Sequence, residues 1–281
     1  YQEVLANHKL TLAQVLITLD DSENRRRYIN ARNTLQTLLG LGAVPLINEN
    51  DTVATDEIRF GDNDRLAARV AAMISADMLV VLSHMDGLYD RDPTNNMNAI
   101  HIPYVKGGLT LEIEAMAGAE KSTDGSGGMV TKLAAAKIAL NAGTCMVIAN
   151  GTENHPIGRI EAGSRCTWFI PTANPKNARK QWISGSLKPN GKLIVDDGAL
   201  GALKAGKSLL PAGITSIIGK FDRGDAITVC SASGAEIARG LVAYSAIDAL
   251  KIIGHKTSEI ENILGYRGRD EMIHRDDMVL S

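Results

Sequence analysis

One polar stretch that follows a short apolar run constrains the fold of this chain more than any other feature. The run Ala43-Val44-Pro45-Leu46-Ile47 has the composition of a buried strand. Amides and carboxylates then crowd residues 48–64, and an alanine-rich, helix-like segment follows directly. In an open α/β sheet, ligands bind beyond the carboxyl ends of the strands. The stretch therefore predicts either a ligand-binding loop or an acidic surface loop that caps the next helix.

Strand-like and helix-like segments alternate in the first part of the chain. We expect strands at 11–19, 43–47, within 73–82 and at 145–149, and helices at 23–39 and 129–142. Asp20, Asp21 and Ser22 read as the cap of the first of these helices. Such alternation predicts an α/β domain, with an open, mostly parallel sheet sandwiched by helices.

The character of the sequence changes near Thr172. Residues 173–187 are polar and contain proline, as linkers often are. Short β-like runs separated by turns follow, which is typical of a small barrel-like β module. We therefore expect a first domain over 1–172, a linker over 173–187 and a second domain over 188–281.

Composition argues against several classes of protein. The net charge of −2 provides no global field for nucleic acid or an anionic membrane. No apolar run approaches the roughly 20 residues of a membrane span. The three cysteines, Cys145, Cys166 and Cys230, are widely spaced and form no CxxC pair, so neither a disulfide framework nor a structural zinc site is indicated. A cytoplasmic protein without a resident metal is expected.

A glycine-rich segment, residues 122–128, precedes the predicted helix at 129–142. Glycines let backbone N–H groups approach an anion, and a helix N-terminus adds a favourable dipole. Lys132, in the first turn, is placed to reach a phosphate. The alternative is an ordinary flexible loop, since a glycine-rich loop alone is a weak signal.

A second phosphate-binding pattern is a false match. Residues 201–208, G-A-L-K-A-G-K-S, satisfy the Walker A pattern letter for letter. A true P-loop follows a buried strand and starts a long helix. Here Pro211 and Gly213 exclude such a helix, and the preceding residues themselves resemble a short helix.

Four segments together resemble a known family. I-N-E-N-D…G-D-N-D, D-G-L-Y-D-R-D-P and G-S-G-G-M-V-T-K resemble the glutamate-phosphorylating branch of the amino-acid kinase family. L-I-V-D-D-G-A…G-K-S-L-L-P-A-G-I resembles the PUA domain that many of these kinases carry at the C-terminus. The resemblance implies an amino-acid kinase fold, incomplete at the N-terminus, and a PUA domain. It also implies transfer of phosphate from ATP, with Mg²⁺, to the γ-carboxylate of L-glutamate, the first step toward proline.

The same resemblance assigns roles to individual residues. Lys132 and Asp64 match catalytic positions, the lysine at the transferred phosphoryl group and the aspartate as its orienting partner. Asp51 and Asn63 match glutamate-binding positions, with Asn48 and Asp62 as additional contacts. The implied ATP-binding residues are Ser83, His84, Ser126, Gly127, Gly128, Met129, Val130, Thr131 and Lys132. Relatives commonly have Thr-Asp where this chain has Ser83 and His84.

Regulation and assembly are also implied by the resemblance. Relatives are inhibited by proline, sensed in the loop that contains Glu57, and form homodimers or homotetramers. The family's N-terminal strand and K-x-G-S/T phosphate-binding turn do not occur after Tyr1. We therefore expect a truncated chain that lacks this turn and one catalytic lysine.

Two alternatives stay open from the sequence. One is an amino-acid kinase that acts on another carboxylate. The other, of a different class, is an RNA-binding protein that acts through its PUA module. Residues 188–281 contain twelve Lys/Arg and twelve Asp/Glu, whereas an RNA footprint normally shows a basic excess. RNA binding is therefore not expected.

Overall fold

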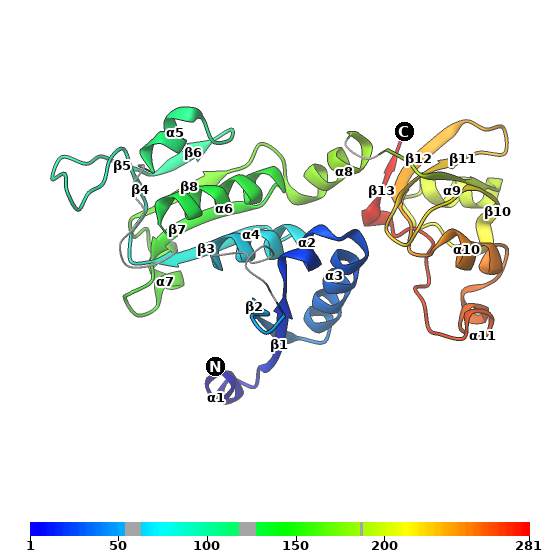
Figure 1. The fold of residues 1–281 in the computed structure, drawn as a ribbon, viewed down its shortest axis with the longest axis horizontal. Helices are drawn as coiled ribbons and strands as arrows, with labels where there is room; N and C mark the ends of the chain where they lie inside the picture. Colours follow the sequence, from blue (N-terminus) through cyan, green and yellow to red (C-terminus); the bar gives the residue numbers. More distant parts are fainter. Residues whose placement is uncertain (54–62, 118–127, 186–187) are drawn as a thin grey trace. The chain divides into compact units, whose positions relative to one another are not determined.

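The computed structural model describes residues 1–53, 63–117, 128–185 and 188–281. The chain divides into two compact units, Tyr1–Ala178 and Arg179–Ser281 (Figure 1). In the described ranges, no helix combines the length and the apolar character needed to cross a membrane.

The first unit opens with two parallel strands and the helices between them. Its first elements are α1 Gln2–Asn7, β1 Thr11–Ile17, α2 Leu19–Glu23, α3 Arg25–Gly40 and β2 Ala43–Glu49. β1 and β2 pair from Thr11 beside Ala43 to Ile17 beside Glu49, so both strands end at the same edge. Parallel strands need a crossover, and α2 and α3 provide it. Ile17 and Leu35 of α3 are buried in the core of this layer.

A four-stranded sheet forms the rest of the first unit. The elements are α4 Asn63–Ile74, β3 Met78–Ser83, β4 Leu88–Tyr89, β5 His101–Ile102, β6 Tyr104–Lys106, α5 Leu111–Met116, α6 Met129–Asn141, β7 Cys145–Asn150, α7 Pro156–Glu161 and β8 Cys166–Ile170. The sheet order is β3-β7-β8-β6, with β3–β7 and β6–β8 parallel and β7–β8 antiparallel. β4 and β5 form a separate antiparallel pair.

Helices α4 and α6 lie side by side against this sheet (Figure 1). Ala68 of α4 and Ala135, Ala136 and Ala139 of α6 are all fully buried. Small side chains at these positions let the two helices approach closely, as dense interior packing requires. The first turns of α4 and α6 therefore come together, which decides the geometry of the candidate site.

The second unit is built on a mixed five-stranded sheet. The division between the units falls inside α8 Pro175–Gly185, and the following elements are β9 Gly191–Val195, α9 Asp197–Lys204, β10 Ile214–Gly219, β11 Ala226–Cys230, β12 Glu236–Leu241, α10 Ala246–Ile252, α11 Ile260–Leu264 and β13 Met278–Leu280, with 3-10 helices Pro211–Gly213, Thr257–Glu259 and Arg275–Asp277. The order is β10-β9-β11-β12-β13, and only β9–β11 is parallel among these pairs. Leu193, Val229 and Ile273 belong to its own buried core.

The rejection of the Walker-like octet is confirmed. Helix α9 ends at Lys204, inside the octet. After Ser208 the chain forms a bridge between Leu209 and Ile273 and then the 3-10 helix Pro211–Gly213. The helix that a P-loop must start is therefore replaced by a turn.

One predicted cap is wrong. Asp20, Asp21 and Ser22 do not precede a helix; they lie inside α2, which Thr18 caps in a reciprocal capping box with Asp21. Asn24 caps α3 instead, its side-chain oxygen accepting from the backbone N–H groups of Arg26 and Arg27. Several neighbouring capping residues compete here, and the sequence alone does not rank them.

Candidate active site

An ion pair between α4 and α6 is the centre of the candidate site. Asp64 lies in the first turn of α4 and Lys132 one turn inside α6. The Lys132 Nζ donates to Asp64 Oδ2 at 3.1 Å, and the two side chains are only 9% and 17% exposed. A lysine in such a setting is held in one position by its partner, which suits a fixed positive charge.

Thr131 adds a second donor to the same carboxylate oxygen. Its Oγ1 lies 3.0 Å from Asp64 Oδ2 and 2.7 Å from the carbonyl oxygen of Gly128. One hydroxyl has one hydrogen, so Thr131 donates to one of these acceptors at a time. The α6 N-terminus is therefore held to α4 by an ion pair and, when the Thr131 hydroxyl donates to Asp64, by a second hydrogen bond.

The start of α6 has the features of an anion-binding terminus. Gly128 is the N-cap, and it has no side chain that could accept from the first N–H groups of the helix. The first turn contains no acidic residue, whereas Lys132 stands at its end. The N–H groups of the first turn, the positive end of the helix dipole and a lysine together favour a phosphate. Val130 is exposed, and Met129 is half-buried.

The ends of β3 and β7 form a second polar edge. Ser83, the last residue of β3, pairs in register with Asn150, the last residue of β7. The backbone N–H of Gly151 donates to the Ser83 carbonyl at 2.7 Å, and His84 is exposed directly after it. Because β3 and β7 are parallel, both residues lie at the edge where such sheets bind ligands.

Asn150 is a candidate that the sequence reasoning missed. Its side-chain oxygen accepts from the N–H and the hydroxyl of Thr152, at 2.7 Å each. This holds the loop after β7 close to its strand end. The available signal was a polar residue directly after the apolar run Val147-Ile148-Ala149, the same pattern that singled out residues 48–64.

The proposed glutamate-side residues lie at the end of β2 and the start of α4. Asn48 and Asp51 are exposed at and just after β2, and Asn63 is exposed at the first position of α4. Ile47 of β2 packs in one cluster with Leu66 of α4. This packing brings the start of α4 toward the end of β2. Glu57, Asp62, Ser126 and Gly127 lie outside the described residues.

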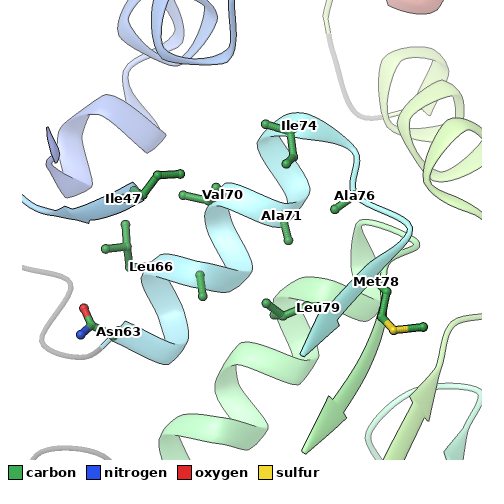
Figure 2. Close-up of a pocket in the computed structure, with 10 residues that line it drawn as sticks. Ile47, Asn63, Leu66, Val70, Ala71, Ile74, Ala76, Met78 and Leu79 are labelled. Atoms are coloured by element: carbon green, nitrogen blue, oxygen red, sulfur yellow. The ribbon is translucent and has the colours of Figure 1, made fainter. Parts of the chain in front are cut away.

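A cavity of about 410 Å³ lies between β2 and β3 along α4 (Figure 2). Ile47, Leu66, Val70 and Leu79 are among its lining residues, and Asn63 is the polar side chain among the lining residues drawn there. An apolar lining of this kind does not suit a triphosphate. The charged pair of Asp64 and Lys132, which is not part of this lining, is therefore the better candidate for the phosphate side.

Comparison with known proteins defines the class. Residues 1–150 match the family model described as "Amino acid kinase family", and residues 191–264 match the PUA domain. The chain belongs to the amino acid kinase family. This confirms the expected fold class, an α/β kinase domain followed by a PUA domain, and the prediction of a kinase.

The similar proteins are, more particularly, glutamate 5-kinases. The chain is 63% identical over 280 residues to the glutamate 5-kinase of Paramagnetospirillum magneticum, covering 100% of this chain and 75% of the relative. For the glutamate 5-kinases of Rhodospirillum rubrum and Brucella anthropi the identities are 56% and 58% over 280 residues, covering 100% of this chain and 74% of each relative. The expected resemblance is therefore confirmed over the full chain.

Proposed function

We propose that this protein transfers the γ-phosphoryl group of ATP to the γ-carboxylate of L-glutamate. The product is glutamyl 5-phosphate, and the reaction is the first step toward proline. The contact that supports the proposal most directly is the 3.1 Å ion pair between Lys132 and Asp64, at the N-terminus of α6. The identity to glutamate 5-kinases over the whole chain supports the choice of substrate.

The reaction needs positioning more than acid–base chemistry. A γ-carboxylate is already ionised at neutral pH, so no general base is required. One of its oxygens attacks the γ-phosphorus while the bond to the β-phosphate oxygen breaks, and ADP leaves with the electron pair. The obstacle is the repulsion between a carboxylate and a polyanion, which a fixed cation relieves.

Lys132 supplies that cation in this proposal, and Asp64 orients it. The lysine ammonium faces the equatorial oxygens of the transferred group, where charge accumulates in the transition state. Asp64 does not contact phosphate, because two anions would repel each other. Gly128, Met129, Val130 and Thr131 present the helix terminus to the nucleotide. Ser126 and Gly127 are further proposed ATP-binding residues.

The remaining residues divide between the two substrates. Asp51 is an anion suited to the glutamate α-ammonium, while Asn48 and Asn63 offer amides that bond groups of either sign. Asp62 is a further proposed contact. Ser83 and His84 lie on the nucleotide side. Mg²⁺ is expected to arrive on the ATP phosphates, which fits its preference for oxygen ligands and retained water.

Trapping of the acyl phosphate tests the proposed reaction. With ATP, Mg²⁺ and hydroxylamine, L-glutamate should give the γ-hydroxamate, whereas aspartate and N-acetylglutamate should not. Lys132→Met should lower kcat by about 10²–10³-fold, since one electrostatic stabiliser of the transition state is removed. Lys137→Met is a matched control: its ammonium pairs with Glu114 on the exposed side of the same helix, at 2.9 Å. Turnover with aspartate or N-acetylglutamate alone would refute the choice of substrate.

Regulation, assembly and location follow as parts of the same proposal. We infer that proline inhibits the enzyme through the loop that contains Glu57, and that the protein forms a homodimer or homotetramer. All three cysteines are free, which fits the reducing cytoplasm. RNA is not proposed as a ligand, because residues 188–281 have no basic excess. Tight, salt-sensitive RNA binding by those residues would overturn this last point.

A further inference from the structure

A cluster of three polar side chains lies just beyond the nucleotide-side end of β3. The hydroxyl of Tyr89 donates to Asp86 Oδ1 at 2.8 Å, and Arg165 Nη1 donates to the Tyr89 hydroxyl at 3.2 Å. Arg165 Nη1 also lies 3.7 Å from Asp86 Oδ2. Asp86, Tyr89 and Arg165, named here the Tyr89 cluster, thus close a triangle in which the tyrosine hydroxyl is both donor and acceptor.

The backbone beside the cluster is fixed to β8. The N–H of Leu88 donates to the Thr167 hydroxyl at 2.7 Å, and that hydroxyl donates to the Ile102 carbonyl at 2.6 Å. Thr167 is fully buried. A Cβ on Gly87, whose φ is +149°, would lie only 2.5 Å from the Thr167 Oγ1. The backbone at Gly87 and Leu88 is therefore packed closely against Thr167, and position 87 requires glycine.

The four residues Ser83 to Asp86 are consequently held at both ends. At one end the Ser83 carbonyl accepts the Gly151 N–H, and at the other Asp86 is bound in the Tyr89 cluster. His84 and Met85 lie between these anchors, and His84 is exposed. A short segment anchored at both ends has few alternative conformations. Little conformational entropy of the segment is therefore lost when a ligand binds to it.

We propose that the hydrogen bonds of the Tyr89 cluster position the Ser83–Met85 segment for the nucleotide and so set the affinity for ATP. This inference rests on the proposed function, in which Ser83 and His84 contact ATP. The cluster is a positioning device and not part of the chemistry. Its members act through the backbone conformation of the segment between them.

The exposure of the cluster separates this role from a purely structural one. The side chain of Arg165 is 61% exposed and that of Asp86 is 33% exposed. Ion pairs whose side chains are this exposed to solvent contribute little to global stability. Loss of the Tyr89 hydroxyl should therefore leave the melting temperature almost unchanged while the local segment gains freedom.

Tyr89→Phe in the chain with both units present tests the inference. The substitution keeps the ring that packs edge-on against His101, at 5.3 Å between centroids, and removes only the hydroxyl. We expect the KM for ATP and the Kd for the non-hydrolysable analogue AMP-PNP to rise about five- to tenfold. The KM for glutamate, kcat and Tm should stay near the wild-type values.

Arg91→Ala is the matched control. Arg91 follows the same short strand, and its guanidinium pairs with Asp90 at 2.7 Å, outside the Tyr89 cluster. This variant should behave as wild type. Arg165→Gln, which removes the charge from the opposite corner of the triangle, should repeat the Tyr89→Phe result.

The inference is overturned if Tyr89→Phe binds AMP-PNP as tightly as Arg91→Ala does. It is equally overturned if all kinetic constants and Tm fall together, because that result indicates a structural role. Absence of AMP-PNP binding by the wild-type protein would also overturn it. Failure of glutamate turnover alone would instead refute the proposed function, while the AMP-PNP comparison would still test the cluster.

Discussion

At the scale of single residues, one carboxylate oxygen organises the candidate site. Asp64 Oδ2 accepts from the Lys132 ammonium and from the Thr131 hydroxyl, at 3.1 and 3.0 Å. The two contacts differ in kind, because the first joins opposite charges and the second has an alternative acceptor in Gly128. Both bonds are charge-assisted because the acceptor is a carboxylate, but only the lysine adds a full opposite charge. The lysine contact should therefore matter more to the proposed reaction than the threonine contact.

This difference predicts an order of effects. Asp64→Asn should lower kcat roughly 10²-fold, since it removes the charge that orients the lysine, and should change the KM for ATP less. Thr131→Val should lower kcat only a few-fold, and Thr131→Ser, which keeps the hydroxyl, should be close to wild type. Steady-state kinetics of the three variants check the order. A Thr131→Val defect as large as that of Asp64→Asn would contradict it.

At the scale of elements, a buried carboxylate joins two parts of the second unit. Arg179, at the start of that unit, donates to Asp277 Oδ1 through Nη2 at 2.6 Å and Nε at 3.1 Å. Arg269 lies 3.8 Å from the other oxygen. Arg179 and Asp277 have side chains only 10% and 8% exposed. Removal of one partner from such a pair leaves a buried charge uncompensated.

Asp277→Asn should therefore lower the free energy of unfolding of the second unit by about 3 kcal/mol or more. Asp276→Asn is the neighbouring control, with a side chain 49% exposed, and should change stability by less than about 0.5 kcal/mol. Urea unfolding followed by circular dichroism measures both. Equal effects of the two substitutions would show that the burial of Asp277 has no energetic consequence.

The sequence predicted elements well where one signal acted locally. β7 and α6 were expected from an apolar run and from a helix that follows a glycine-rich loop, and both are present. Contacts between distant positions were not predictable in the same way. Tyr89 and Arg165 are 76 residues apart, and nothing local in either segment indicates the other. From the sequence, only the family resemblance predicts that Asp64 pairs with Lys132.

At the scale of the whole molecule, the second unit has a core that is its own. Leu193, Ile227, Val229 and Met272 pack in one buried cluster drawn from Arg179–Ser281. Tyr244 lies in the same cluster and donates its hydroxyl hydrogen to the Arg269 carbonyl. Burial, followed by the nearby charges of Tyr266 and Asp270, raises the pKa of Tyr244 to about 12.

These features predict that residues 179–281, expressed alone, unfold cooperatively and lose stability in alkali. A tyrosine whose pKa is raised on folding stabilises the fold fully below its unfolded pKa of about 10. That contribution is lost as pH rises from 10 through 12, by about 3 kcal/mol at most. Chemical denaturation at pH 9 and pH 12 measures the loss. Tyr244→Phe should show a smaller decrease; an equal decrease would assign the effect to other groups.

The pairing of Lys132 with Asp64 has a consequence for catalysis. Because Asp64 compensates the Lys132 ammonium, the ion pair itself carries little net charge and adds little to the attraction of the helix terminus for a free phosphate. In the proposed reaction, the lysine interacts most strongly with the phosphoryl group in the transition state, where that group carries its greatest negative charge. Interactions that are stronger in the transition state than in the ground state raise kcat, whereas equal binding of both states only lowers KM. In the proposed reaction the ion pair should accordingly contribute more to kcat than to the affinity for the nucleotide.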